Sequence, residues 1–314
     1  MLVAPARLGS QVSCPLISIV IPTFRRPDVL SEILTALQPQ LSGTETEVLV
    51  VDNCPRASSR SLVRNWVSRS VRYIAEAKNG VVHARNRGLA EARGAYILFL
   101  DDDEVPAPTW LRAYIDAAER GVDIGFGRIR ARYAEPPAGD VRPLLDVMFT
   151  RDFPTDDGSD ITDQYADLGC GNAMFHRATC FASPDPFEVA YNRFGGEDSA
   201  LIKQLVSDGV RLSWIANGLV EEVVPPDRQT PEYLKTRRYN QGRLRSRVNI
   251  EHSVGAGLMW MGVGAVQTAL YSGLWSIACA MRSNRATYFS VQIQGGLGKV
   301  LWWRTPAGLH TYGT

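Results

Sequence analysis

Apolar runs alternate with amphipathic or polar segments through the first hundred residues of the chain. Four apolar runs have the length and bulk of buried strands: residues 16–22, 47–52, 71–74 and 96–100. Helices are expected between them at residues 27–38, 58–68 and 81–92. This βαβαβαβ order predicts an α/β fold with a mostly parallel, Rossmann-like central sheet flanked by helices and joined by right-handed crossovers.

The pattern changes after residue 122. Further elements are expected as a strand at 124–133, a short strand at Met174 and Phe175, a helix from Glu197 to about Asp208, and a strand near 211–216. Residues 134–166 are rich in Pro, Asp and Gly, which predicts a long, mobile active-site segment.

The C-terminal part of the chain has a different character. Six basic residues lie within residues 235–247, and no charged residue occurs from Ser253 to Met281. This run exceeds the ~20 residues needed to cross a bilayer, but it is rich in Gly, Ala and Ser. A transmembrane helix, an in-plane or re-entrant membrane helix pair and a buried helical hairpin all remain open.

Basic residues at both ends of this uncharged run argue against a single crossing and favour attachment to one membrane face. Arginines and lysines would contact anionic headgroups, and aromatic side chains would lie at the interface. The aromatic residues available for this are Trp260, Tyr271, Trp275, Trp302 and Trp303.

Composition narrows the function classes. The hydrophobic content of 45% and charged content of 21% are those of an ordinary globular protein, and a net charge of +1 gives no electrostatic argument for nucleic-acid binding. Only four histidines occur, which argues against a His-rich zinc site. Five scattered cysteines without a CxxC pair suit a reducing compartment.

Four consecutive acids, Asp101 to Glu104, follow the strand at 96–100. Their mutual repulsion should raise their pKa values unless a hard divalent cation, commonly Mg²⁺ or Mn²⁺ shared with a phosphate, offsets it. The alternative is a solvated acidic turn in which Asp103 or Glu104 caps the next helix. Because parallel strands end at the same edge of a sheet, Asp52 and Asp101 to Asp103 can face one ligand.

A second acidic pair follows two glycines at a predicted helix start, in the order Gly195, Gly196, Glu197, Asp198. The helix dipole favours carboxylates there, so a capping role is one interpretation. A carboxylate in a cleft can also act as a general base toward a hydroxyl. Neither a G-x-G-x-x-G nor a G-x-x-x-x-G-K-[ST] motif follows the first strand.

Phosphates would then be held by a metal and nearby cations. Lys78, Arg85 and Arg87 flank the predicted strand edge and can serve this purpose. A solvated helix face is the alternative interpretation of the two arginines.

Several motifs occur together in one order: IVIPTFRRP at 19–27, VVDN at 50–53, NG at 79–80, ARNRGL at 84–89, FLDDDE at 99–104, WL at 110–111, GCGN at 169–172 and GED at 196–198. Through them, residues 16–230 resemble the family 2 glycosyltransferases, which implies the GT-A fold. The segment from Val224 to Arg228 and the basic stretch to Arg247 resemble the ExoM-like subgroup of exopolysaccharide glucosyltransferases.

The resemblance implies roles for individual residues. The implied donor-binding residues are Pro22, Thr23, Arg25, Asp52, Asn53, Gly80, Arg85, Asp101 and Asp102. Among these, Pro22 and Thr23 would lie along the nucleoside, Asp52 would accept a hydrogen bond from the base, and Arg85 would reach the base or the diphosphate. Asp101 and Asp102 would lie against the ribose and sugar.

The remaining implied roles concern the reaction. Asp103 would bind the Mg²⁺ or Mn²⁺ ion that bridges the diphosphate. Asp198 would be the general base, with Glu197 beside it contacting the acceptor.

The implied function is a metal-dependent, inverting hexosyltransferase in cell-surface or exopolysaccharide synthesis. It would move one sugar from a nucleotide sugar, expected to be a UDP-sugar, to a hydroxyl of a lipid-linked or oligosaccharide acceptor. Asn53 stands where many relatives carry a second Asp, which loosens the nucleotide assignment. The absence of a Q-x-x-R-W motif around Gln241 favours single transfers.

Two other classes remain open: a sugar nucleotidyltransferase that makes an activated sugar, and a non-catalytic membrane scaffold that retains the fold. A sugar nucleotidyltransferase would usually have a Gly-rich, basic loop after the first strand, where this chain has Pro22 to Arg26.

The expected domain plan is a leader at 1–14, a catalytic domain at 15–232 and a helical, membrane-associating tail at 233–314. The catalytic domain would divide into a nucleotide-binding half, 15–121, and an acceptor half, 122–232. The apolar stretch from Leu16 to Ile21 is too short for a signal peptide. We therefore expect a cytoplasmic protein bound at the inner face of the plasma membrane, peripherally or as a monotopic protein.

Overall fold

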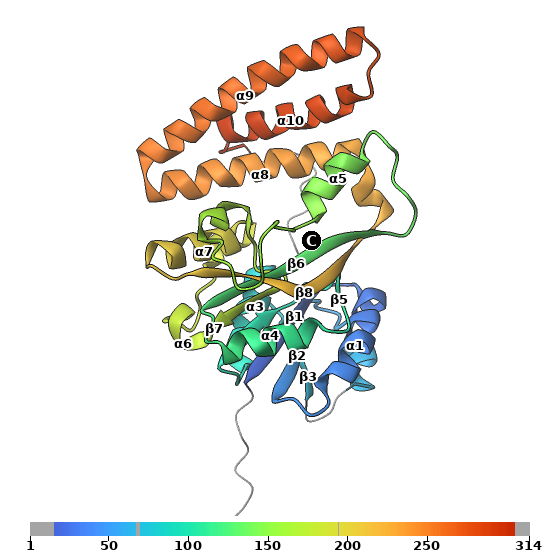
Figure 1. Ribbon diagram of the computed structural model, residues 1–314, viewed down its shortest axis with the longest axis vertical. Helices are drawn as coiled ribbons and strands as arrows, with labels where there is room; N and C mark the ends of the chain where they lie inside the picture. The colour runs from blue at the N-terminus through green and yellow to red at the C-terminus, as the bar shows by residue number, and fades with distance from the viewer. Residues whose placement is uncertain (1–15, 67–69, 194, 305–314) are drawn as a thin grey trace, which may run out of the picture.

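The computed structural model describes residues 16–66, 70–193 and 195–304 of the 314-residue chain. Its centre is an eight-stranded sheet in the order β3-β2-β1-β4-β7-β6-β8-β5 (Figure 1). The strands are β1 (Ile17–Thr23), β2 (Thr46–Asp52), β3 (Val71–Ala75), β4 (Tyr96–Phe99), β5 (Glu104–Pro106), β6 (Ile124–Tyr133), β7 (Ala173–His176) and β8 (Leu212–Val224). The expected leader at 1–14 lies outside the described residues.

The first half of the sheet is the predicted parallel unit. β1 pairs in parallel with β2 and β4, and β2 pairs in parallel with β3, so the mostly parallel α/β prediction is confirmed. Both faces of β1 are buried: Ile19 packs with one core and Val20 with the other. Helices α1 (Pro27–Leu41) and α4 (Trp110–Glu119) belong to the first core, and α3 (Val81–Glu91) and α7 (Glu197–Ser207) to the second.

Several shorter elements complete the α/β body, residues 16–230. They are α2 (Arg60–Arg64), α6 (Arg177–Cys180), η1 (Thr162–Asp167), η2 (Val189–Arg193) and η3 (Pro226–Gln229). The helix expected at 58–68 is described only as far as residue 66, and its helical part is the short α2.

Three expectations for the second half were wrong in extent. β8 runs from Leu212 to Val224, well beyond the predicted 211–216, because it pairs with β6 on both sides of a register shift and also with β5. The last of the four acids begins β5, a strand that was not predicted. Residues 134–166 are not one loop, because they contain α5 (Arg142–Phe149) and η1, and Leu144, Leu145 and Phe149 of α5 are buried.

The tail forms three long helices: α8 (Pro231–His252), α9 (Val254–Ala280) and α10 (Arg285–Val300). They stack as a layer at one end of the molecule (Figure 1). Leu234 of α8 and Val291 of α10 share a small core with α5, which joins this layer to the α/β body. Among the described residues, no helix has both the length and the apolarity that a membrane crossing needs.

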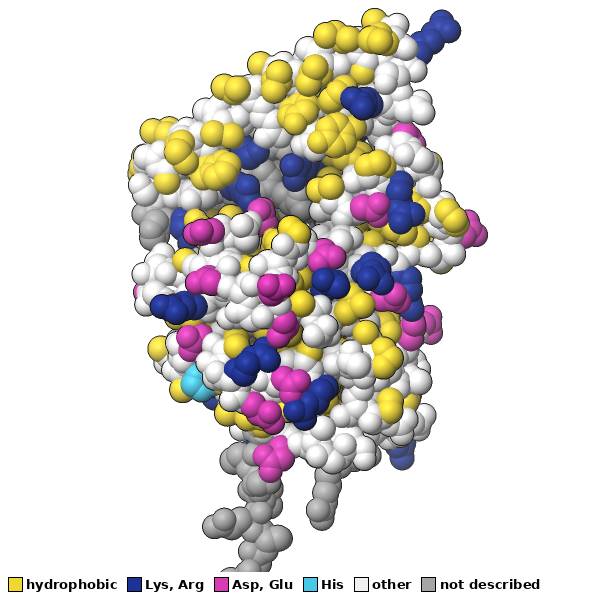
Figure 2. Space-filling view, in the orientation of Figure 1, with side chains coloured by type: hydrophobic (Ala, Val, Ile, Leu, Met, Phe, Trp, Pro, Cys, Tyr) yellow, Lys and Arg dark blue, Asp and Glu magenta, His cyan; other side chains and the backbone are white. Residues whose placement is uncertain are grey.

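Helix α9 buries one side and exposes the other. Helix α9 can pack closely against α10 because Gly264 and Gly296 face each other. The Gly264 carbonyl oxygen is only 2.8 Å from where a side chain at Gly296 would begin. Of the 12 exposed large hydrophobic side chains in the described chain, 9 lie within residues 254–281. Figure 2 shows these apolar side chains gathered over the helical layer, so α9 does not form a fully buried hairpin.

Candidate active site

A buried arginine joins the two acidic segments. Arg85, on α3, contacts Glu197 at 2.5 Å through Nη1 and Asp101 at 3.4 Å through Nη2. Arg85 and Glu197 have side chains only 6% exposed, so the predicted solvated helix face does not apply to Arg85. Burial alone would lower the pKa of Arg85, but the Asp101 and Glu197 carboxylates raise it above its usual value. The end of β4 and the start of α7 therefore meet at this guanidinium.

A glycine-containing segment contacts both groups of acids. A side chain at Gly169 would begin 2.8 Å from Oδ2 of Asp198, and one at Gly171 would begin 2.7 Å from Oδ2 of Asp101. Cys170, between them, is fully buried, and burial raises the pKa of its thiol well above the usual value. Residues 169–171 thus contact both Asp101 and Asp198.

Two polar residues hold this segment in place. Asn172, in a left-handed conformation with φ 48°, accepts hydrogen bonds from Trp110 and Tyr114 through Oδ1. Arg151 donates to the carbonyls of Gly127, Gly171 and Asn172, and burial lowers its pKa. Backbone oxygens are thereby paired around a site that must keep its shape.

The backbone before Glu197 requires glycine. Gly195 and Gly196 have φ values of 73° and 91°, a region that side chains with a Cβ rarely adopt. The chain then enters α7 with Glu197 and Asp198 in its first turn. Asp198 is half-buried, and its Oδ1 accepts from the Ser199 amide at 2.7 Å. Its Oδ2 faces the Gly169 backbone.

Two further arginines hold the acids at the end of β4. Arg26 contacts Asp102 and Asp103, both at 2.7 Å, and Arg228 contacts Asp103 at 3.0 Å. Thr23 and the Phe24 amide also donate to Asp102, at 3.1 and 3.0 Å. The first strand and the segment after β8 therefore meet at this acidic turn.

The pKa values of Asp101, Asp102 and Glu104 are raised, as repulsion predicted, but burial is the larger cause. Burial, followed by neighbouring negative charges, raises the pKa of Asp101. The same causes raise the pKa of Asp102 to about 6 and the pKa of Glu104 well above its usual value. Glu104 accepts from the Asp101 amide at 3.0 Å. The helix-capping alternative is wrong, because α4 begins at Trp110 after Thr109.

Asp52 and Asn53 at the end of β2 are engaged within the protein. Asp52 is almost fully buried and accepts from the Cys54 and Ser59 amides at 3.0 and 2.8 Å and from the Tyr73 hydroxyl at 3.1 Å. These contacts shape the loop after β2. A hydrogen bond from Asp52 to a nucleotide base stays a prediction.

Asn53 fixes the neighbouring loop before α3. Its side chain donates to the Glu76 and Lys78 carbonyls and accepts from the Gly80 amide at 2.7 Å. Gly80 has φ 124°, and a side chain there would collide with Asn192. Both residues therefore have a clear role in shaping this edge of the sheet, whatever they contact in a ligand.

The other predicted binding residues differ in exposure. Pro22 and Thr23 are buried at the end of β1. Arg25 is exposed, with its guanidinium 4.7 Å from the centre of the Phe24 ring. Lys78 is exposed, and Arg87 pairs with Glu91 on its own helix at 2.8 Å. Of these residues, Thr23 contacts the acids after β4 by donating to Asp102. The contacts described for Arg25 and Arg87 are with Phe24 and Glu91 instead.

Residues 18–181, more than half of the chain, match the profile of Glycosyl transferase family 2. The chain belongs to this family. Over 282 residues this glycosyltransferase is 26% identical to the succinoglycan biosynthesis protein ExoM of Rhizobium meliloti, covering 88% of the chain and 89% of ExoM. It is 33% identical to the hyaluronan synthase of Pasteurella multocida over 102 residues, which are 32% of the chain but 10% of that synthase.

The fold also agrees with a solved relative. The crystal structure of residues 1–349 of TarS from S. aureus covers 90% of each chain with a TM-score of 0.50 at 14% identity. At this identity the likeness shows the fold alone, which confirms the predicted GT-A architecture of this glycosyltransferase.

Sequence reasoning missed several charged residues of the glycosyltransferase site. Arg26, Arg151 and Arg228 contact the acids or the segment behind them, as described above. Glu222, on β8, has its pKa raised to about 8, first by burial and then by the Asp103 carboxylate. Arg26 lies in the motif at 19–27 and Arg228 in the segment at 224–228, so position within those motifs was the available signal.

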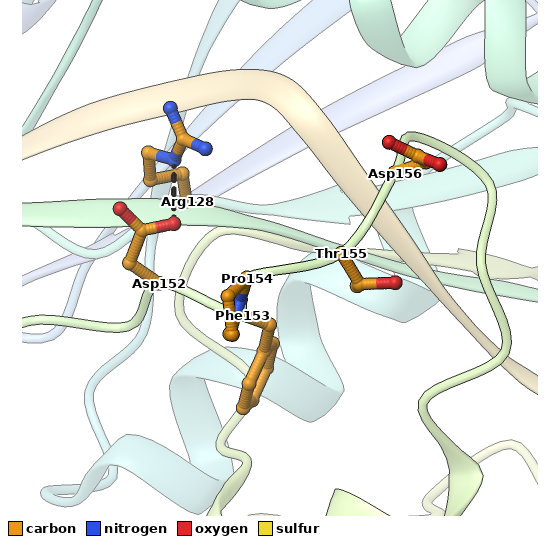
Figure 3. Close-up of a pocket in the computed structure, with 6 residues that line it drawn as sticks. All are labelled: Arg128, Asp152, Phe153, Pro154, Thr155 and Asp156. Atoms are coloured by element: carbon orange, nitrogen blue, oxygen red, sulfur yellow. Dashed lines mark hydrogen bonds and ion pairs between the residues drawn. The ribbon is translucent and has the colours of Figure 1, made fainter.

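A shallow cavity of about 570 Å³ lies beside this site. Figure 3 shows Arg128 of β6 facing Asp152 in its wall, at 2.9 Å, with Phe153, Pro154, Thr155 and Asp156 beside them. None of the acids at 101–104 or 197–198 lines it. The cavity is therefore a hollow next to the site and not the space between the acids.

The raised pKa of Glu197 predicts how stability depends on pH. Burial, the Asp198 charge and smaller effects bring this pKa to about 7, so the folded state keeps a proton that the unfolded chain releases above about pH 4.5. The free energy of unfolding should fall as pH rises from about 5 to 7, and Glu197→Gln should flatten this fall. Urea unfolding at pH 5, 6, 7 and 8 measures it.

Glu135→Gln, at an exposed position, is the control for the loss of one carboxylate. This control variant should have the same pH profile of stability as the unchanged protein. Parallel profiles for the protein and Glu197→Gln would show that Glu197 ionises no differently in the folded and unfolded states.

Proposed function

We propose that this family 2 glycosyltransferase moves one sugar from a UDP-sugar to a hydroxyl of a lipid-linked glycan, with inversion, in exopolysaccharide synthesis. The observation that carries the proposal is the junction at Arg85, which pairs with an acid after β4 and with one at the start of α7, both groups of acids lying against residues 169–171. The names of two similar proteins support the proposed pathway and donor. ExoM is named for succinoglycan biosynthesis, and TarS has been crystallised with UDP-GlcNAc.

The donor would lie along the edge formed by the ends of β1, β2 and β4. Arg26 and Arg228 already hold Asp103, and Nε of Arg85 is a buried donor without a hydrogen-bond partner among the described residues. Guanidinium groups are well suited to phosphate oxygens, and they would stabilise the negative charge that builds on the leaving diphosphate.

The acids fit a divalent cation only together with a phosphate. Within residues 16–66, 70–193 and 195–304, no three metal-ligating side chains gather into a site of their own. Mg²⁺ and Mn²⁺ accept one or two carboxylates when phosphate oxygens and water complete the shell. Asp103 would be the protein ligand, and the bound cation would supply Lewis-acid stabilisation of the diphosphate.

Asp198 would act as the general base. Its half-buried carboxylate stands at the start of α7, against Gly169, and the acids after β4 lie against Gly171. It would take the proton of the acceptor hydroxyl while that oxygen bonds to the anomeric carbon and the bond from that carbon to the diphosphate breaks. One displacement from the opposite face inverts the configuration. Glu197, held by Arg85, would position the acceptor beside Asp198.

Removing the base should separate chemistry from binding. Asp198→Asn should lower transfer by about 10²–10⁴-fold, since a positioned base contributes that much, while UDP binding stays the same. Sugar transfer to a membrane extract and UDP calorimetry measure the two properties. Asp208→Asn, at the exposed far end of α7, is the matched control and should retain transfer. Equal loss of UDP affinity would instead place Asp198 in the donor site.

The cation proposal concerns Asp103. Mn²⁺ should strengthen UDP binding to the unchanged protein, and Asp103→Ala should abolish most of that enhancement, because the protein ligand is lost. Calorimetry of UDP with and without Mn²⁺ measures this. Identical affinities with and without the ion in the unchanged protein would contradict a metal site here, and the arginines would then hold the diphosphate alone.

We also propose that the tail attaches the enzyme to the cytoplasmic face of the plasma membrane. The exposed side chains Leu258, Val266 and Leu270 are between 58% and 69% accessible and recur at helical spacing on α9. Arg282 and Arg285, exposed just beyond α9, would contact anionic headgroups. This arrangement suits a helix lying in the plane of the interface.

Replacing Leu258, Val266 and Leu270 together by Ser should weaken vesicle binding at least about tenfold, since burying each such side chain contributes about 1.5 kcal/mol or more. Co-sedimentation with phosphatidylglycerol vesicles measures it. Val147→Ser, at an exposed apolar position on α5, is the control. Undiminished sedimentation of the triple variant would refute attachment through α9.

A further inference from the structure

Basic side chains gather where the three tail helices meet. Arg238 and Arg245 lie seven residues apart on α8, so they share one face of that helix, and Lys299 reaches the same place from α10. The Trp260 ring of α9 lies 5.1 Å from the Arg245 guanidinium and 6.0 Å from the Lys299 nitrogen. Figure 2 shows Lys and Arg side chains in a hollow of the surface at the level of these helices.

The partners of two of these cations are amides. Lys299 donates to Gln267 at 2.5 Å, and Arg238 donates to Gln292 at 3.1 Å and to Gln241 at 3.2 Å. Arg245 pairs with Asp167 at 2.7 Å. Three cations thus share one carboxylate in the contacts of the described residues, and the cluster carries a net positive charge.

Holding these charges together is unfavourable without an anion. Burial and then the charges of Arg238 and Arg245 lower the pKa of Lys299 to about 8. Burial lowers the pKa of Arg238 as well, and its Nε is buried against Gly295 without a hydrogen-bond partner among the described residues. Cations held this close together favour a bound oxyanion, which their guanidinium and ammonium groups are suited to bind.

The cluster borders the predicted general base. Arg245 also donates to the Ala166 carbonyl, and two residues after Asp167 the chain reaches Gly169, against which Asp198 packs. Leu244, next to Arg245, lies 3.2 Å from where a side chain at Gly196 would begin. The cations therefore lie on the α7 side of the site.

We propose that Arg238, Arg245 and Lys299 bind the phosphate or diphosphate that joins the acceptor glycan to its lipid. The inference rests on the proposed function and names its acceptor class. The guanidinium and ammonium groups would hold the phosphate, the sugar would extend toward Asp198, and the lipid chain would leave along the apolar surface of α9. A headgroup phosphate of the surrounding membrane presents the same chemistry, so the experiment must separate the two sources.

The test uses the full chain with Arg238 and Lys299 both changed to Gln, which removes charge and keeps polar side chains. Geranyl diphosphate is the soluble probe, and geraniol shows what the chain contributes without phosphate. We expect the unchanged protein to bind the diphosphate at least tenfold more tightly than the alcohol, and the double variant to lose at least tenfold of that affinity. Lys299→Arg should retain it, which excludes mere misfolding of the tail.

The matched control is Arg282→Gln with Arg285→Gln, two exposed cations at the far end of α9. It should weaken binding to phosphatidylglycerol vesicles and leave geranyl diphosphate affinity unchanged. If the Arg238 and Lys299 variant loses vesicle binding while geranyl diphosphate never binds, the cluster is a membrane headgroup site and the acceptor assignment is overturned. Unchanged diphosphate affinity in that variant overturns it equally.

UDP calorimetry separates this inference from the proposed function. The double variant should bind UDP with Mn²⁺ as the unchanged protein does, because its cations lie on the α7 side of the site. Failure of UDP to bind the unchanged protein would remove the proposed function itself. Normal UDP binding with no effect of the double variant on geranyl diphosphate would remove only the acceptor site.

Discussion

The Arg85 guanidinium is the charge on which the arrangement of the site depends. Glu197 stands 112 residues away in sequence, and its carboxylate is buried beside Asp198 and near Asp101. Such a group of acids would repel one another if no cation lay between them. One buried arginine, paired with Asp101 and Glu197, therefore allows the end of β4 and the start of α7 to lie side by side. Truncating it would leave buried carboxylates uncompensated, a change that commonly costs about 3–5 kcal/mol.

The same principle recurs at the outer side of the acidic turn and in the segment behind it. Arg26 and Arg228 neutralise Asp103 from two different parts of the chain, while Arg151 binds the carbonyls that surround residues 169–172. The protein thus holds its acids in place with arginines. A nucleotide diphosphate and a cation would bring their own charges to this balance, so binding should rearrange these ion pairs.

The tail helices differ from the rest of the protein in what they expose and in what they enclose. They expose apolar side chains outward, and between them they enclose cations whose charges are poorly compensated. Small residues such as Gly264, Gly295 and Gly296 permit the close packing that brings α8, α9 and α10 together. An acceptor with both a phosphate and a lipid chain would match both features, whereas a free soluble sugar would use neither.

Local pattern was sufficient for much of the fold and for the location of the acids. The apolar runs predicted β1 to β4 and their parallel pairing, because strand length and burial are local properties of sequence. The two glycines before Glu197 likewise marked a helix start that needs positive φ. Pattern was insufficient for α5, since a segment dense in Pro and Asp concealed its buried residues.

The tertiary structure alone decided which charges pair. Asp52 and Asn53 turned out to shape their own loops, Arg85 proved buried, and Arg26, Arg151 and Arg228 joined the site from distant segments. The physical reason is that periodicity shows which face of an element avoids water but carries no record of the partner across the cleft. Ion pairs between residues 76 to 125 positions apart depend on how the completed sheet and helices bring their ends together.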